Sequence, residues 1–182
     1  MPLGDGTPRV FVSQLDPRAV TALAVGDLRQ ANRYNEIELP ESFVDAESVR
    51  LWQLRHRQIA TNPASADWIT GAVVDAEKGL VVGRAGYHAP PDEAGMVEIG
   101  YAVDPQYRRR GYARGALKFL LARAEREPLV RTVRACIAPD NIASHSLIAQ
   151  YGFVEIGTQN DDVDGLEVVY ELATTIQGGM PS

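Results

Sequence analysis

The most informative segment of this sequence runs from Val97 to Leu121 and reads VEIGYAVDPQYRRRGYARGALKFLL. In its first part apolar residues alternate with small or polar ones, which is the period of a half-buried β-strand. Asp104-Pro105 ends that strand, because proline cannot donate a hydrogen bond to a sheet. From Gly111 onward, apolar residues recur at spacings of three and four, the pattern of a helix with one apolar face. The stretch therefore predicts a strand, an arginine-rich turn and a helix.

The turn carries Arg108, Arg109 and Arg110 immediately before Gly111. The first turn of a helix has backbone N–H groups without intrahelical acceptors and holds the positive end of the helix dipole. A glycine there lets a phosphate approach the backbone closely, and arginines add charge and forked donors. The residues alone allow two interpretations: a phosphate-binding site, or a solvated basic turn in front of an ordinary helix.

Length and composition predict one soluble globular domain over residues 1–182, with flexible ends at 1–7 and 174–182. The net charge of −6 argues against a general nucleic-acid binder. No signal peptide opens the sequence and no apolar run approaches transmembrane length, so we expect a cytoplasmic protein without a membrane partner.

Cysteine and histidine usage limits the metal and redox chemistry. The single cysteine, Cys136, excludes an intrachain disulfide and a multi-cysteine metal site, and its apolar surroundings predict a buried structural thiol. His56, His88 and His145 lack the spacing of zinc ligands. We therefore predict no metal site.

The rest of the chain predicts further strands and helices around this stretch. The elements expected before it are a strand at 10–12, a helix at 18–31 that Gly26 weakens or splits, a helix from the N-cap Asp45 to about Ala60 with Val49, Leu51, Trp52 and Leu54 on its apolar face, and a strand pair at 68–74 and 80–87. The elements expected after it are a strand at 130–138, a short helix from Asp140 or Asn141 to Gln150, a strand at 153–157, a polar loop at 158–165 and a strand at 166–172. The predicted fold class is α/β (α+β): a mixed, mostly antiparallel sheet with helices on both faces.

These residues resemble the GNAT acyltransferase superfamily, whose members bind acetyl-CoA. Arg108-x-x-Gly111-x-Ala113 is similar to the Q/R-x-x-G-x-G/A signature of that superfamily and stands between a strand and a helix. The next strand ends before Asn141-x-x-Ser144, and Gly152-Phe153 follows. The resemblance covers about residues 68–172 and implies the GNAT fold, with six to seven strands. Within the superfamily, E-I-G-Y at 98–101 and the N-x-x-S motif are most similar to the RimJ/RimL-like branch, which acetylates ribosomal proteins.

The resemblance implies a pose for acetyl-CoA. The pantetheine arm would lie along Ala102 and Val103, where the fourth and fifth strands of the family separate, and Asn141 would contact the same arm. Asn141 can equally be a plain helix N-cap, and the two roles are compatible. The diphosphate would be held by backbone N–H groups of the turn and the helix start, with side-chain charge from its arginines: Arg108, Arg109, Arg110, Gly111, Tyr112, Ala113 and Arg114.

The resemblance also implies roles in catalysis. Glu98 lies at the usual position of the family's catalytic glutamate and would act as general base, directly or through water. A backbone N–H near Val103 would serve the oxyanion. Many relatives carry a tyrosine as leaving-group acid where this chain has Ile148, and Ser144 is the expected substitute. The alternatives are an outward-facing strand residue for Glu98 and a first-turn helix serine for Ser144.

The function implied is an acetyl-CoA-dependent N-acetyltransferase. It would move an acetyl group to a primary amine of a protein N-terminus or a small molecule, by direct transfer in a ternary complex. A catalytically silent acyl-CoA-binding or sensing domain is the alternative. Two acidic segments, Asp92-Glu93 and Asp161, Asp162 and Asp164, favour a cationic acceptor if they are more than solvated loops. The C-terminal strand pair could close a homodimer, although no residue requires one.

Overall fold

The computed structural model describes residues 6–162 and 165–174, so most of the two ends expected to be flexible lies outside the described residues. The chain divides into two compact units. The first unit holds the residues up to Pro90 together with Gly100–Phe119, and the second holds Pro91–Ile99 together with the residues from Leu120 onward. That the whole chain folds as a single domain stays a prediction.

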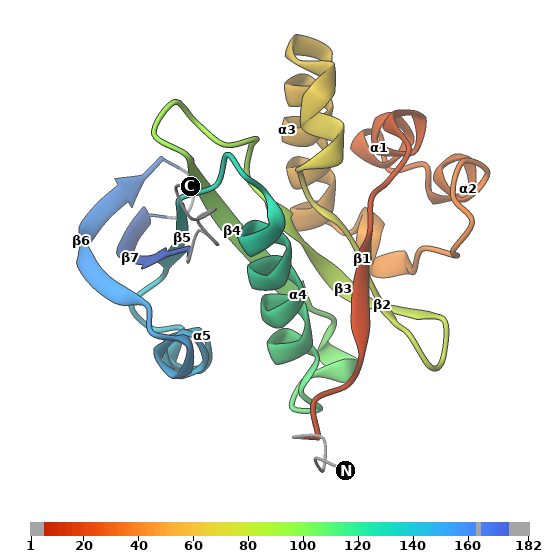
Figure 1. Cartoon of the computed structure of the whole chain (residues 1–182). Helices are drawn as coiled ribbons and strands as arrows, with labels where there is room; N and C mark the ends of the chain where they lie inside the picture. The colour runs from red at the N-terminus through yellow and green to blue at the C-terminus, as the bar shows by residue number, and fades with distance from the viewer. Residues whose placement is uncertain (1–5, 163–164, 175–182) are drawn as a thin grey trace, which may run out of the picture. The chain divides into compact units, whose positions relative to one another are not determined.

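Seven strands form one sheet in the order β1-β2-β3-β4-β5-β7-β6 (Figure 1). The strands are β1 (Val10–Ser13), β2 (Gly71–Asp75), β3 (Leu80–Tyr87), β4 (Met96–Val103), β5 (Thr132–Ile137), β6 (Val154–Asp161) and β7 (Gly165–Ala173). The pairs β1/β2, β2/β3, β5/β7 and β6/β7 are antiparallel, and β4/β5 is parallel. The expected mixed, mostly antiparallel sheet is therefore confirmed.

Five α-helices lie within the described residues. They are α1 (Pro17–Ala24), α2 (Leu28–Asn32), α3 (Ala46–Thr61), α4 (Tyr112–Arg126) and α5 (Ile142–Ile148), with short 3₁₀ turns at Glu41–Val44, Pro63–Asp67, Pro105–Tyr107 and Ala149–Tyr151. None of the helices in the described ranges is both long and apolar enough to cross a membrane.

In the first unit, the helical predictions hold with one correction. Gly26 adopts φ +75° and splits the helix expected at 18–31 into α1 and α2, one of the two effects expected of it. Asp45 is the N-cap of α3, and its side chain accepts a hydrogen bond from the Ser48 N–H, as expected. Leu54, expected on the apolar face of α3, is instead 44% exposed, whereas Arg55 is buried. The buried face of α3 follows Ser48, Trp52 and Arg55, which recur at helical spacing.

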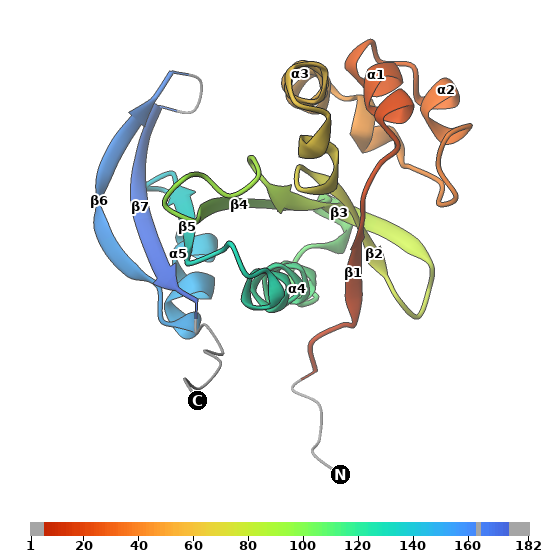
Figure 2. The same ribbon diagram turned by 45° about the horizontal axis from the view of Figure 1, so that its top comes forward.

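The first unit has a sheet covered on both faces. All five residues of β2 are buried, and Ala72 and Val74 join the apolar cluster formed by α1, α2 and α3. Figure 2 shows these helices on one face and the start of α4 on the other. The strand expected at 68–74 begins only at Gly71, because the 3₁₀ turn continues to Trp68, whose N–H donates to the Ser65 carbonyl.

In the second unit, β5 alternates as predicted, with Val133, Ala135 and Ile137 buried. The prediction of a polar loop at 158–165 is wrong. Residues Thr158–Asp161 continue β6 and pair with β7, as Figure 1 shows for the long two-stranded ribbon. The polar sequence reflects an exposed strand at the end of the sheet, not a break in the strand. Asp164 lies outside the described residues.

Candidate active site

The junction between β4 and α4 is anchored at Asp104, whose side chain is 6% exposed. Its backbone N–H donates to the Val82 carbonyl at 3.0 Å, and its carboxylate accepts from the Ser42 hydroxyl at 2.8 Å. These bonds attach the end of β4 to β3 and to the segment before α3. The turn that follows therefore starts from a fixed point.

The turn itself has an unusual backbone. Arg109 adopts φ +58° and Gly111 adopts φ +85°. A left-handed conformation is uncommon for a residue other than glycine, and such residues concentrate at ligand sites. Turns of this kind direct successive N–H groups toward an anion. The Gly115 N–H donates to the Gly111 carbonyl, which closes the first turn of α4 and places the N–H groups of Gly111, Tyr112 and Ala113 at the positive end of the helix dipole.

The three arginines of the turn are placed differently. Arg108 Nε donates to the Val103 carbonyl at 3.1 Å, which folds its guanidinium back over the end of β4. The Arg110 guanidinium carbon lies 5.9 Å from the centre of the Tyr107 ring. All three arginines are exposed. Arg108 contacts the strand end and Arg110 lies near the Tyr107 ring, so we expect Arg109 to be the arginine that gains a new anionic contact.

Tyr112, the first residue of α4, is buried, and its side chain is occupied within the protein. Its hydroxyl donates to Asp75 Oδ2 at 2.6 Å, and Lys78 Nζ lies 3.0 Å from the same carboxylate oxygen and 3.1 Å from the hydroxyl. Burial would raise the pKa of Asp75, but hydrogen bonds from Tyr112, from Lys78 and from the backbone together hold it well below its usual value. Only the backbone N–H of Tyr112 is thus a candidate for cofactor binding.

Two glycines permit close backbone contacts at this junction. A Cβ at Gly83 of β3 would collide with the Ala102 carbonyl oxygen, so Gly83 allows Ala102 and Val103 to approach β3. A Cβ at Gly111 would lie 2.9 Å from Pro8 Cδ. The sequence analysis missed the role of Gly83, although a lone glycine inside a strand is a known sign of close backbone approach.

The parallel register of β4 and β5 runs from Met96 opposite Thr132 to Ile99 opposite Ala135. β4 itself continues from there to Val103. Ala102 and Val103 therefore lie beyond the paired segment, at the end of the strand expected to bind the pantetheine arm.

Glu98, in the second unit, is half-buried on β4 and lies opposite Arg134 of β5. Burial raises the pKa of the nearby Cys136 thiol to about 12, together with the negative charge of Glu98 and a hydrogen bond to it. Arg134 in turn binds Glu171 of β7 at 2.6 Å. Glu98 is therefore held among polar partners on the sheet face. Cys136 is half-buried, which corrects the expectation of a buried thiol.

Asn141 and Ser144 meet at the start of α5, also in the second unit. Asn141 is the N-cap, and its Oδ1 accepts from the Ser144 N–H at 3.1 Å, which confirms the expected cap. The next residue, His145, contacts the Tyr170 hydroxyl through Nδ1 and the Ala138 carbonyl through Nε2. Ile148, at the position of the family's tyrosine, is 1% exposed and belongs to the core.

The acidic segments lend little support to a cationic acceptor. Asp92 Oδ1 accepts from the N–H groups of Ala94 and Met96, so this carboxylate stabilises the turn before β4. Asp161 is the last residue of β6 and Asp162 is in the turn after it. Among residues 6–162 and 165–174, no three His, Cys, Asp or Glu side chains come together as a metal site requires.

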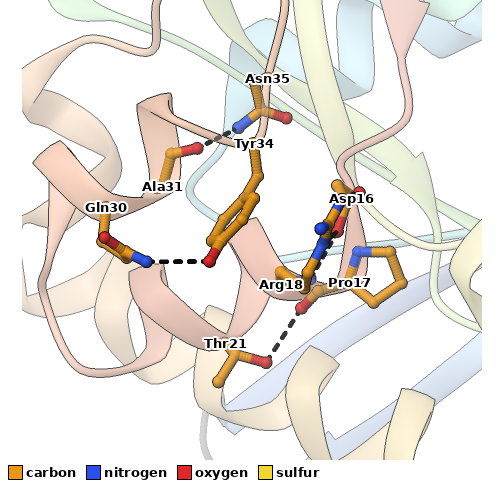
Figure 3. A network of polar contacts seen from close by, with 8 residues as sticks. All are labelled: Asp16, Pro17, Arg18, Thr21, Gln30, Ala31, Tyr34 and Asn35. Carbon is orange, nitrogen blue, oxygen red and sulfur yellow. Dashed lines mark hydrogen bonds and ion pairs between the residues drawn. The ribbon is translucent and has the colours of Figure 1, made fainter.

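A hollow of about 390 Å³ on the outside of α1 and α2 does not compete as an active site. Figure 3 shows the contacts beside it: Arg18 binds Asp16 through two hydrogen bonds, and Gln30 donates to the Tyr34 hydroxyl. The Arg18 guanidinium also lies 4.5 Å from the Tyr34 ring centre. Hydrogen bonding to Arg18 lowers the pKa of Asp16 to about 2. These polar groups already stabilise the α1–α2 pair.

The residues present fit the diphosphate of acetyl-CoA. The turn offers left-handed backbone at Arg109 and Gly111, backbone N–H groups at the start of α4, and consecutive arginines. That Ala102, Val103 and Asn141 contact the pantetheine arm stays a prediction.

Comparison with known proteins gives the same family. The model of the acetyltransferase (GNAT) domain matches residues 9–154. An uncharacterised N-acetyltransferase, YjdG of Bacillus subtilis, is 33% identical over 87 residues, which are 48% of this chain and 50% of that protein. The match thus spans half the length of this curated relative.

Two solved structures illustrate the fold. The structure of a putative ribosomal-protein-serine acetyltransferase from Vibrio cholerae is 16% identical, with a TM-score of 0.61 over 92% of this chain and 95% of that one. The microcin C7 self-immunity acetyltransferase MccE, solved with acetyl-CoA and AMP, is 13% identical, with a TM-score of 0.62 over 95% and 97%. At these identities the likeness concerns the fold, whereas the domain model covers most of the sequence. The chain belongs to the GNAT acetyltransferase domain family.

Proposed function

We propose that this protein is an acetyl-CoA-dependent N-acetyltransferase that moves an acetyl group directly to a primary amine. The observation that carries the proposal is the turn from Arg109 to Gly111 at the start of α4, in a chain of the GNAT domain family. When bound, acetyl-CoA supplies an acetyl group activated as a thioester.

The first unit would bind the cofactor. N–H groups from Arg109 to Arg114 hold the diphosphate, and the guanidinium of Arg109 adds charge to it. Arg108 and Arg110 support this turn through Val103 and Tyr107. The backbone of Ala102 and Val103 binds the amides of the pantetheine arm as a neighbouring strand would, and a backbone N–H near Val103 stabilises negative charge on the acetyl oxygen.

Proton transfer is assigned to Glu98 and Ser144. Glu98 accepts a proton from the acceptor ammonium or amine, directly or through water, since its carboxylate is half-buried and already held by polar neighbours. Ser144 donates a hydrogen bond to the leaving thiolate, and the side-chain N–H₂ of Asn141 contacts the pantetheine arm, because its Oδ1 is occupied by the helix cap.

The acceptor class follows from the motifs and the neighbours. E-I-G-Y and N-x-x-S are most similar to the RimJ/RimL-like branch, and one structural neighbour is a putative ribosomal-protein-serine acetyltransferase. We therefore propose a protein N-terminus as the first acceptor to test, with small-molecule amines as the alternative. The site of action would be the cytoplasm, where acetyl-CoA and new N-termini meet.

A thiol-release assay with acetyl-CoA and a panel of N-terminal peptides and amines tests the proposal. The wild-type protein should release coenzyme A only in the presence of an acceptor. Binding of acetyl-CoA without release for any acceptor would instead support the sensing alternative.

The role of Glu98 has its own test. Glu98→Gln should lower kcat about a hundredfold or more, the usual contribution of a general base, and leave the dissociation constant of acetyl-CoA unchanged. Glu93→Gln, which changes an exposed carboxylate in the turn before β4, is the matched control and should keep full activity. An unchanged kcat and pH–rate profile in Glu98→Gln would refute the assignment.

A further inference from the structure

A continuous set of polar contacts crosses the sheet of the second unit. Gln159 Nε2 of β6 donates to Cys136 Sγ of β5 at 3.3 Å and to Glu167 Oε2 of β7 at 3.0 Å. Glu98 of β4 is the diagonal neighbour of Cys136 across the β4/β5 pair, and its charge and a side-chain hydrogen bond are among the causes that raise the pKa of the thiol, after burial. Four strands thus contribute to one connected group of side chains that ends at Glu98.

The strand register explains why these side chains meet. Glu98 lies opposite Arg134, and Cys136 follows two residues later on the same strand. Residues opposite one another, and residues two apart, share a face of a sheet. Gln159 lies opposite Glu167 in the β6/β7 pair, and Arg134 lies opposite Glu171 in the β5/β7 pair. The contacts therefore follow from backbone pairing and do not depend on a flexible loop.

The thiol is suited to donate a hydrogen bond and unsuited to act as a nucleophile. Cys136 is half-buried, and its environment keeps it protonated. Four neighbours set this environment: Glu98 of β4, Glu167 of β7, Gln159 of β6 and Arg134 of β5. An S–H group that stays protonated over the working pH range is a constant donor to a carboxylate.

We infer that Cys136 is a positioning residue, whose thiol holds one oxygen of the Glu98 carboxylate so that the other remains directed at the acceptor amine. Gln159 fixes the sulfur from its other side. The inference rests on the proposed function of Glu98 as general base. It assigns the single cysteine of the chain to the catalytic step without giving it covalent chemistry.

Substitutions at Cys136 test the inference by separating kcat from KM. Cys136→Val fills a similar volume without a donor and should lower kcat about tenfold, near the low end of what a hydrogen bond to a charged group contributes. The KM for acetyl-CoA should stay unchanged. Cys136→Ser keeps the donor and should restore most of the lost rate. Equal kcat values in Cys136→Val and wild type, with both proteins folded by circular dichroism, would overturn the inference.

A second readout needs no enzymatic activity. Cys136 is the only cysteine, so its reaction with a disulfide reagent such as 5,5′-dithiobis(2-nitrobenzoic acid) reports on this thiol alone. At pH 8, Glu98→Gln should react several-fold faster than wild type, because removing the negative charge increases the thiolate fraction. Glu155→Gln, which changes an exposed carboxylate of β6, is the control and should react like wild type. Equal rates for Glu98→Gln and wild type would show that the two side chains are not coupled.

The outcomes distinguish the inference from the function on which it rests. If Glu98→Gln keeps full kcat, the assignment of the base fails, whatever Cys136 does. If Glu98→Gln loses activity while Cys136→Val does not, only the positioning role fails. If the thiol reacts faster in Glu98→Gln and Cys136→Val loses rate, both are supported.

Discussion

Arg109 shows how one residue can combine backbone strain with a proposed ligand contact. Its φ of +58° is a conformation that costs a residue with a Cβ about 1 kcal/mol or more. Its side chain is exposed, as are those of Arg108 and Arg110, but these two also contact the Val103 carbonyl and the Tyr107 ring. Sequence reasoning treated the three arginines as one basic run, whereas the structure separates a candidate ligand contact from two supports.

Replacing Arg109 with glycine separates charge from backbone shape. Arg109→Gly should leave the melting temperature unchanged or raised, because glycine adopts φ +58° without strain, and should weaken acetyl-CoA binding about tenfold through the lost guanidinium. Isothermal titration calorimetry and thermal unfolding measure the two effects. Arg126→Ala, at the opposite end of α4, is the control and should bind normally. Unchanged affinity for acetyl-CoA in Arg109→Gly would show that the Arg109 guanidinium does not bind the diphosphate.

Gly111 is less suitable for such a test. Its φ of +85° and the 2.9 Å approach of Pro8 Cδ to a built Cβ mean that any side chain there disturbs folding as well as binding. Loss of cofactor binding in a Gly111 variant would therefore not identify the diphosphate site.

At the scale of elements, the turn between β2 and β3 is attached to the first residue of α4. Asp75 and Lys78 from the turn bind the Tyr112 hydroxyl. The carboxylate is almost fully buried, and its pKa is held below the usual range. The start of the helix that carries the proposed diphosphate site is thus fixed by a charged contact from a distant segment.

Removing that hydroxyl should destabilise the fold in a pH-dependent way. Tyr112→Phe should lower the free energy of unfolding at pH 7 by about 1–3 kcal/mol, since Asp75 loses a donor. A lowered folded-state pKa stabilises the protein above the unfolded value of about 4, and this stabilisation is lost as the pH falls further. The difference in the free energy of unfolding between Tyr112→Phe and wild type should therefore become smaller below about pH 4.

Urea unfolding at several pH values between 3 and 7 measures this difference in the free energy of unfolding. Tyr107→Phe keeps the neighbouring ring and serves as the control, because the ring contact between Tyr107 and Tyr112 does not involve Asp75. If the difference in the free energy of unfolding is constant across this pH range, the lowered pKa of Asp75 does not depend on the Tyr112 hydroxyl.

At the scale of the whole molecule, β6 is the strand at one end of the sheet order. Val154 and Ile156 on this strand are 64% and 52% exposed. An edge strand presents unpaired backbone groups, and exposed β-branched residues on it favour pairing with another chain. We therefore expect a second copy of this chain to pair along β6. The homodimer that the sequence analysis allowed would then form at this edge strand.

Light scattering after size exclusion tests this expectation. The wild-type protein should have twice the mass of one chain, and Ile156→Lys should be monomeric, because a buried unpaired charge opposes association. Leu129→Lys, a change at a 73% exposed residue outside any strand, should remain dimeric. A monomeric wild-type protein at high concentration would contradict the proposed edge pairing.

The features that depend on neighbouring residues could be predicted from the sequence. They are the strand from Met96 to Val103, the turn, α4, the cap at Asn141 and the stop at Gly152 after the 3₁₀ turn that follows α5. They follow from local periodicity, proline and glycine positions and capping side chains. Such signals lie within a few residues of one another and act before any tertiary contact forms.

Which side chains form internal contacts and which remain exposed depends on tertiary contacts, and these the sequence pattern did not predict. Arg55 is buried and Leu54 is exposed, and β6 continues through a polar segment. The Tyr112 hydroxyl binds Asp75, and Glu98 lies near Cys136. Each of these depends on residues that are distant in the chain and on the register between strands. Local propensity carries no information about such pairings, because the free energy of a buried polar contact depends on the partner that the fold supplies.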